Sequence, residues 1–268
     1  MGLDSRYLCI LQNLSPFVEN ASFARLLSCA VYGFPAVYEH YAQSVLPIVN
    51  WSRAGILQIG TCFVVAPQRA ITALHCVQPA KALAIRGVPK EELAKASFYS
   101  HSKEALDLVV ISFDKPVFGG LPAIAVPDGE PQILNEVIAL GYPNIPSFIP
   151  ALAAEAAQVS GRLAVSRGRI ASAPTEIFAG TELLLITARV RGGFSGGPIL
   201  DTYGQAVGMV SREPMAETGF DIGPRYDELG YGVAVSCAVA HELLGAIKTG
   251  DSRPLSMPQV DFRDFDEC

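Results

Sequence analysis

The chain has 268 residues, a formal net charge of −6 and a hydrophobic fraction of 50%. This length accommodates one large domain or two small ones, and this hydrophobic content excludes a chain that is disordered by composition. Lys and Arg form no cluster of the kind that phosphate binding needs, and no run approaches the roughly 18 apolar residues of a membrane-spanning helix. We therefore expect neither a nucleic-acid partner nor a membrane partner.

The predicted elements begin with helices and continue as short strands. Apolar residues between 16 and 46 recur at helical spacing and predict one or two helices. Short β-type runs then alternate with turn residues, which is typical of a sandwich or barrel. The runs cover Ile56–Ala66, Ala70–Leu74, Ala82–Gly87, Ala96–Tyr99, Leu106–Phe113, Ala123–Val126, Glu136–Leu140, Gln158–Val165, Ser166–Ser172, Leu183–Val190, Gly197–Leu200, Ala206–Ser211 and Tyr231–Val235.

The Pro-rich stretch Pro122–Pro131 lies between two groups of strands and predicts two similar all-β halves. The resulting organisation is a helical N-terminal extension at residues 1–54, a first unit at 55–127 and a second unit at 128–250. An amphipathic helix, Ala238–Lys248, closes the second unit before the stop signal at Gly250. Residues 251–268 are acidic, and we expect them to form a loose tail.

One short motif surrounds a serine with glycines, from Arg191 through Ser195 to Pro198. Glycines supply conformations with positive φ and let a substrate approach the main chain. In such a turn the amides of Gly193 and Ser195 can point at one spot and stabilise an oxyanion. The alternative is an ordinary Gly-rich turn between two strands.

Two further residues carry chemistry in the first unit. His75 follows an apolar strand, and Asp107 stands inside an apolar run, where an unpaired charge would be costly. Taken alone, His75 fits a structural histidine and Asp107 fits a cap on a turn that begins at Glu104. Together with Ser195 they form one of the known orders of a catalytic triad, in which the imidazole is the base and the carboxylate orients it.

Four motifs resemble the chymotrypsin/trypsin-like serine peptidases, nearest to the HtrA-like and glutamyl-endopeptidase-like branches. They are GTCFVVAPQRAITALHCV (Gly60–Val77), LDLVVI (Leu106–Ile111), NEVIALGYP (Asn135–Pro143) and GFSGGPIL with GQAVGMVS (Gly193–Leu200 and Gly204–Ser211). The resemblance implies an all-β fold of two six-stranded antiparallel barrels. His75 and Asp107 would come from the first barrel, and Ser195 would come from the second. We expect no PDZ domain, because only about 20 residues follow the last predicted helix.

The resemblance also implies a substrate-binding strand, Val210–Ser211–Arg212, that pairs with the extended substrate backbone. Arg189 stands six residues before the serine, where the family places its selective side chain, and would favour Asp or Glu at the cleavage position. The alternative is that Arg189, and with it Arg191 and Arg212, points to solvent or pairs with Glu213. Phe194 replaces the aspartate with which many family members pair a freed N-terminus, so that route of activation is not expected.

The sequence thus predicts a serine endopeptidase that acts on proteins or peptides through an acyl-enzyme, with no cofactor and no metal. Regulation is expected through the N-terminal extension or through the loop at 214–230. The alternatives are a catalytically silent binding protein of the same fold and an esterase that uses the same triad. The residues before position 12 are a poor signal peptide, so we expect a cytoplasmic protein, with a periplasmic or secreted one as the alternative. Cys62 and Cys76 flank a predicted hairpin and are either a disulfide or two buried thiols.

Overall fold

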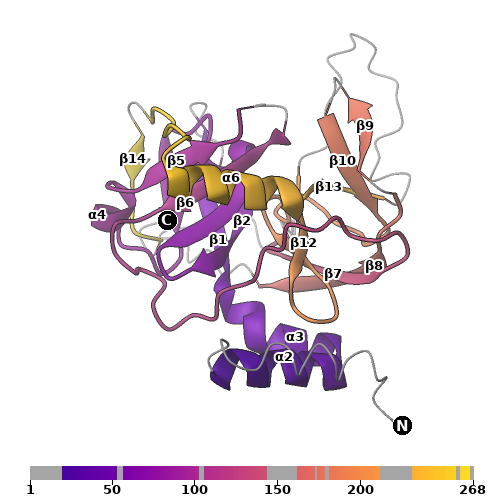
Figure 1. Ribbon diagram of the computed structural model, residues 1–268. Helices are drawn as coiled ribbons and strands as arrows, with labels where there is room; N and C mark the ends of the chain where they lie inside the picture. The colour runs from indigo at the N-terminus through magenta and orange to yellow at the C-terminus, as the bar shows by residue number, and fades with distance from the viewer. Residues whose placement is uncertain are drawn as a thin grey trace.

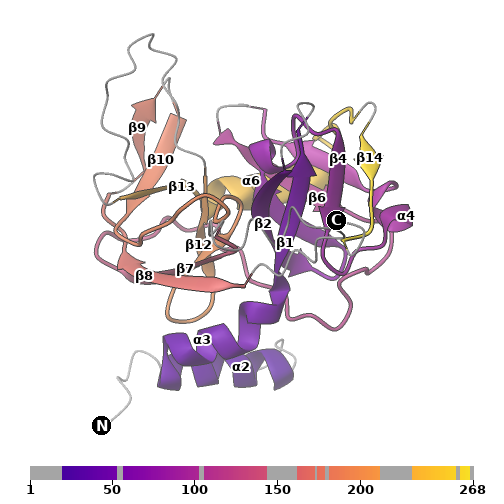
Figure 2. The ribbon, with the colours of Figure 1, turned by 180° about the vertical axis from the view of Figure 1, so that it is seen from behind.

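The computed structural model describes residues 20–52, 57–102, 106–143, 162–172, 174–178, 181–211, 231–257 and 260–265. Two curled β-sheets stand side by side, and helix α6 (Cys237–Thr249) lies across them (Figure 1). The opposite view shows helices α2 and α3 together below the sheets (Figure 2). This arrangement confirms the predicted chymotrypsin-like fold of two β-barrels.

The first sheet contains seven strands among the described residues, in the order β14-β4-β1-β2-β3-β6-β5. Six of these pair antiparallel, as predicted, and the C-terminal β14 adds a seventh by pairing parallel to β4. The short helix α4 (Lys90–Leu93) lies between β4 and β5 in the sequence. The strands are β1 (Val45–Trp51), β2 (Leu57–Ala66), β3 (Arg69–Ala73), β4 (Ala82–Ile85), β5 (Ser97–Ser100), β6 (Leu108–Ser112) and β14 (Asp261–Phe262).

The second sheet also has seven strands within the described ranges, in the order β8-β7-β11-β12-β13-β10-β9, all antiparallel. The count exceeds the predicted six. Strands β12 and β13 are buried along their whole length, whereas edge strand β8 alternates between half-buried and exposed residues. The strands are β7 (Glu136–Gly141), β8 (Ala164–Arg169), β9 (Thr175–Phe178), β10 (Thr181–Ile186), β11 (Pro198–Leu200), β12 (Ala206–Val210) and β13 (Gly232–Ser236).

The N-terminal extension contains two helices, α2 (Asn20–Tyr32) and α3 (Phe34–Tyr41), as the helical spacing predicted. Gly33 separates them with a φ of 65°, a left-handed conformation that favours glycine. The first barrel then begins at β1, ten residues before the predicted boundary at 55. The sequence does not predict strand β1, because it contains Pro47 and proline within an apolar run argues against a central strand.

The predicted strand Ala123–Val126 is not a strand. This part of the linker makes one backbone hydrogen bond to each barrel: the Ile124 N–H donates to the Val64 carbonyl at 2.9 Å, and Ala125 accepts from Ala206 at 2.9 Å. Ile124 is fully buried, so its strand-like composition reflects burial between the barrels. Strand β8 also crosses the predicted break at residue 165, and the predicted start at Gln158 lies outside the described residues.

The C-terminal residues were expected to be loose, and this expectation is wrong for their described part. After α6 the chain crosses the first barrel, where the Leu255 N–H donates to the Phe98 carbonyl at 2.6 Å. It then adds β14 beside β4. The Phe265 ring is 8% exposed, packs with Val49 and Ala84, and lies 5.0 Å from the Arg86 guanidinium carbon. The acidic composition of these residues suggested a loose tail, although a few apolar side chains among them pack on the first barrel.

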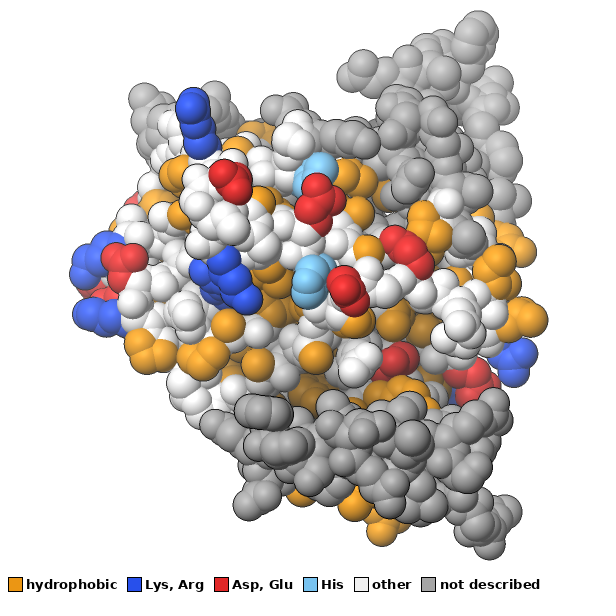
Figure 3. Space-filling model, viewed as in Figure 1, with side chains coloured by type: hydrophobic (Ala, Val, Ile, Leu, Met, Phe, Trp, Pro, Cys, Tyr) orange, Lys and Arg blue, Asp and Glu red, His pale blue; other side chains and the backbone are white. Residues whose placement is uncertain are grey.

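No helix in the described part of the chain combines the length and apolar content needed to cross a membrane. On the face that α6 crosses, basic side chains are interspersed with acidic and apolar ones (Figure 3).

Replacing Phe265 with alanine should lower the free energy of unfolding by about 3 kcal/mol, because the ring fills a buried site beside β4. Urea unfolding followed by fluorescence measures this loss. The exposed Arg253→Ala in the same segment is the control and should change stability by less than about 0.5 kcal/mol. Equal stabilities for the parent and the Phe265 variant would show that the segment does not support the barrel.

Candidate active site

Strands β3 and β6 bring His75 and Asp107 together. The two strands are antiparallel, and the last residue of β3, Ala73, pairs with the first residue of β6, Leu108. The residues directly after β3 therefore lie beside those directly before β6. His75 occupies the short 3-10 helix Leu74–Cys76 directly after β3. The Leu74 N–H donates to the Asp107 carbonyl at 3.1 Å, which fixes the two backbones to each other.

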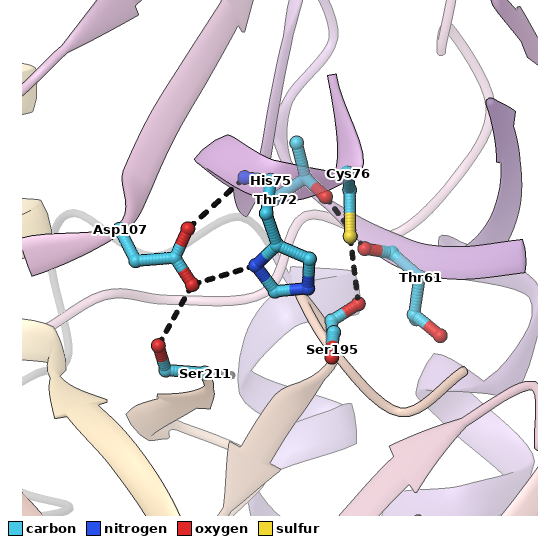
Figure 4. Close-up of polar contacts among 7 residues, drawn as sticks. All are labelled: Thr61, Thr72, His75, Cys76, Asp107, Ser195 and Ser211. Atoms are coloured by element: carbon cyan, nitrogen blue, oxygen red, sulfur yellow. Dashed lines mark hydrogen bonds and ion pairs between the residues drawn. The ribbon is translucent and has the colours of Figure 1, made fainter. Parts of the chain in front are cut away.

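Among the described residues, the Asp107 carboxylate accepts three hydrogen bonds (Figure 4). Its Oδ2 lies 2.8 Å from His75 Nδ1 and accepts from the Ser211 hydroxyl at 2.8 Å, and its Oδ1 accepts from the His75 backbone N–H at 3.0 Å. The side chains of His75 and Asp107 are 24% and 18% exposed. Asp107 has a φ of 48°, a strained conformation that aspartate tolerates better than most residues. The carboxylate is therefore held in one orientation toward the imidazole.

The pKa values of the two groups move apart. Burial alone would raise the pKa of Asp107, but the hydrogen bond and charge of His75 hold it below its usual value. Burial alone would lower the pKa of His75, but the hydrogen bond to Asp107, with a contribution from Cys76, raises it above its usual value. The pair thus favours an ionised carboxylate beside an imidazole with increased basicity.

Ser195 lies in the loop between β10 and β11, and this loop contains a tight turn. The Phe194 N–H donates to the Arg191 carbonyl at 3.0 Å, and Gly193 has a φ of 96° at the third position of the turn, which defines a type II turn. The amides of residues 194, 196 and 197 donate within the protein. Within the described part of the chain, the Gly193 and Ser195 amides donate no hydrogen bond. These are the two amides that the sequence predicted for an oxyanion hole.

The imidazole of His75 lies between Asp107 and Ser195 (Figure 4). One ring nitrogen bonds the carboxylate, and the other faces the side on which Ser195 lies. No hydrogen bond joins the Ser195 hydroxyl to His75 among the described contacts. Such a bond is often long or absent in a catalytic site without substrate.

Thr61 of β2 joins this loop to the first barrel, and the sequence gave no signal for it. Its N–H donates to the Ser195 carbonyl at 2.8 Å, and its hydroxyl donates to the Gly193 carbonyl at 2.7 Å. The same hydroxyl accepts the Tyr142 N–H at 3.1 Å. A Cβ on Gly196 would lie 2.1 Å from the Thr61 carbonyl, so only glycine fits there. Thr61 therefore sets the position of the serine loop against β2.

Cys62 and Cys76 are free, buried thiols. The Cys76 sulfur lies 3.4 Å from the Ser195 carbonyl oxygen, on the wall of the site, and the sequence did not assign it this place.

The predicted substrate-binding residues have different environments. Both backbone groups of Val210 are used by the serine loop: it accepts from Gly196 at 2.7 Å and donates to Gly197 at 2.9 Å. The Ser211 N–H donates to Val233, and its carbonyl accepts no hydrogen bond from the described residues. Arg189 is exposed, and Arg212 and the loop at 214–230 lie outside the described residues.

The nucleophile cleft is a cavity of about 600 Å³ that opens beside the serine. Gly193, Ser195 and His75 line it together with the ends of β1 and β2 and the turn after His75. Arg189 is not among its described lining residues. Its other lining residues are Asn50, Ser52, Leu57, Gln58, Ile59, Gly60, Cys76, Gln78, Pro79 and Gly192.

A double β-barrel with His, Asp and Ser converging at the junction of its halves defines the chymotrypsin-like class of fold and site. The trypsin-like peptidase domain family matches residues 60–209. The chain therefore belongs to the trypsin-like peptidase family. This family match agrees with the resemblance to the trypsin-like peptidases found in the motifs.

Among curated proteins, the chain is similar to the serine proteases Rv3671c and MT3772 of two Mycobacterium tuberculosis strains. Each is 32% identical over 219 residues, which cover 70% of this chain and 51% of the relative. The chain thus spans about half the length of the curated relatives it matches.

The solved structures support the same fold. The active form of the M. tuberculosis Rv3671c protease superposes with a TM-score of 0.56 at 20% identity, covering 82% of this chain and 87% of that one. The HtrA-type protease AlgW with a tripeptide gives a TM-score of 0.56 at 18% identity, covering 81% of this chain and 64% of that one.

Replacing Thr61 with valine should lower the free energy of unfolding by on the order of 1–3 kcal/mol for each buried group left unpaired, the Gly193 carbonyl and the Tyr142 N–H. Thr61→Ser keeps the hydroxyl and should retain most of the stability. Thermal or urea unfolding of the three proteins tests this. Comparable losses in the serine and valine variants would mean that the methyl group, not the hydroxyl, is what matters.

Replacing Asp107 with asparagine should lower the pKa of His75, because the raising contribution of the carboxylate is lost, while burial and the contribution of Cys76 remain. In the parent, a raised pKa gives stability that is present below the unfolded pKa and lost as pH rises through the folded one. In the variant this contribution should shrink, so stability should fall less as pH rises through this range. NMR titration of the imidazole, with urea unfolding across the same range, measures both. The exposed Asp114→Asn is the control, and an unmoved midpoint in Asp107→Asn would contradict the assignment.

Proposed function

We propose that the chain is a serine endopeptidase in which Ser195, His75 and Asp107 act as the catalytic triad. The observation that carries this proposal is the Asp107–His75 contact of 2.8 Å, in which His75 lines the same cleft as Ser195 and the two amides that donate no hydrogen bond among the described residues. A serine hydroxyl needs an adjacent base at neutral pH, and an oriented imidazole is suited to that task.

Acylation follows from this arrangement. The Ser195 hydroxyl turns toward the free ring nitrogen of His75, loses its proton to it and attacks the substrate carbonyl. The Gly193 and Ser195 amides donate to the oxygen that becomes negative, and Asp107 stabilises the imidazolium. When the C–N bond breaks, His75 gives its proton to the leaving amine, and the acyl group stays on Ser195.

Deacylation repeats these steps with water as the nucleophile. His75 takes a proton from the water as it attacks the acyl carbonyl, and returns a proton to Ser195 as the C–O bond breaks. The products are a free acid and the regenerated site. No cofactor enters either half of the reaction, and the substrate is a protein or peptide.

The Ser211 carbonyl, which accepts no hydrogen bond from the described residues, supports a role in binding the extended substrate backbone, because it can accept a substrate N–H next to the site. Val210 acts instead as a support for the serine loop, since its own backbone groups are occupied. Selection by Arg189 or Arg212 stays a prediction. The exposed side chain of Arg189 gives it no support.

Regulation through the N-terminal extension would act at a distance. The described residues of the extension, 20–44, line neither of the two cavities at His75. Tyr41 packs on Gly204 in the turn between β11 and β12 instead. A truncation that tests this idea has to end before Val45, because β1 belongs to the first barrel.

Reaction with a fluorophosphonate probe tests the proposed function. The parent should gain one adduct by intact mass and hydrolyse a quenched peptide library, and Ser195→Ala should gain none and lose at least about 10³-fold in kcat/KM. Circular dichroism and unfolding of Ser195→Ala serve as the fold control.

The outcomes separate the alternatives. Labelling without peptide hydrolysis but with rapid hydrolysis of unactivated esters would favour an esterase. Failure of the folded parent to label would favour a binding protein that keeps the fold.

A further inference from the structure

A second cavity, of about 510 Å³, lies on the Asp107 side of His75. We call it the C-terminal cavity, because one of its walls is Ser256, Met257 and Val260. The other walls are Leu74, His75, Gln78, Pro79, Ala80 and Asp107. The family match at residues 60–209 ends well before the segment that closes it.

The C-terminal segment, which comprises Leu255–Met257 and strand β14, is fixed to the site by specific contacts. The Gln78 side-chain amide donates to the Ser256 carbonyl at 3.3 Å and to the Met257 sulfur at 3.1 Å. On either side, Leu255 bonds to Phe98 and β14 pairs with β4. Met257 is thus held between two anchors, so the wall it forms belongs to the folded barrel.

The two cavities share one border. His75, Gln78 and Pro79 line both the nucleophile cleft and the C-terminal cavity. Ser195 lines only the nucleophile cleft. A peptide whose scissile carbonyl lies at Ser195 would therefore reach the C-terminal cavity with a side chain that flanks the cleaved bond.

The lining indicates which side chain fits. Leu74, Ala80, Met257 and Val260 give the cavity an apolar interior, of a volume typical of binding sites for small groups. The ionised Asp107 at its edge disfavours an acidic side chain by like-charge repulsion. An aliphatic or aromatic side chain matches both features.

We propose that Met257 is a specificity-determining residue, and that the C-terminal segment forms a subsite for an apolar substrate side chain flanking the cleaved bond. This inference rests on the proposed peptidase function. It assigns to a part of the chain outside the matched family region a direct role in choosing the substrate.

The test uses the full chain and quenched peptides with one cleavable bond. Each flanking position is varied in turn among Gly, Ala, Leu, Phe and Asp, and kcat/KM is divided by the fraction of protein that the fluorophosphonate labels. At one flanking position the parent should prefer Leu or Phe to Gly by about 10-fold or more. Met257→Trp fills the cavity and should reduce the Phe/Ala ratio about 10-fold, whereas Met257→Ala enlarges it and should raise that ratio.

The two Met257 variants form a matched pair, because both lose the contact from the Gln78 amide to sulfur. A merely structural role would change all peptides by one factor in both variants, and only a subsite moves the size preference in opposite directions. Leu255→Ala trims a side chain of the same segment that does not line the cavity, keeps the backbone hydrogen bond to Phe98, and should keep the parental ratio. Unchanged ratios in both Met257 variants, with peptide hydrolysis intact, would overturn this inference alone. A parent that neither labels nor hydrolyses any peptide would overturn the proposed function and this inference with it.

Discussion

The hydrogen bonds of Thr61 across the junction of the two barrels determine where the serine loop lies. Thr61 comes from β2, yet it bonds the carbonyls of Gly193 and Ser195 in the second barrel, 132 residues further along the chain in the case of Gly193. With these two carbonyls held by the first barrel, Gly193 and Ser195 line the cleft, and among the described residues their amides donate no hydrogen bond. The rest of the site depends on this contact, because His75 and Asp107 are fixed in the first barrel.

The first barrel supplies its two residues as one preassembled pair. The register of β3 against β6 sets the backbones side by side, and the strained φ of Asp107 turns its carboxylate toward the imidazole. The hydroxyl of Ser211 donates a further hydrogen bond from the second barrel. The pair is therefore locked from both sides of the junction, which limits the motion of the groups that exchange protons.

The C-terminal segment links the stability of the first barrel to the shape of the site. As β14 it covers the edge of β4, which would otherwise offer unpaired backbone groups to other chains. A few residues earlier it meets Gln78, which borders both cavities at His75. Substitutions that release the segment would thus affect both folding and the walls around the histidine.

The sequence by itself predicted two all-β halves and the residues of the candidate site, and the resemblance of its motifs to the trypsin-like peptidases implied the double-barrel fold. Alternating apolar runs reveal strands locally, and His75, Asp107 and the glycines around Ser195 stand out because their polarity or flexibility conflicts with those runs. Only the tertiary structure decided the contacts that Thr61, β1, β14 and Met257 make. Thr61, the proline-containing β1 and the acidic C-terminal residues carry no distinctive local pattern. Their structural roles come from hydrogen bonds to partners far away in the chain. The prediction of a strand at Ala123–Val126 was wrong for the same reason, because this segment is buried between two barrels and not within a sheet.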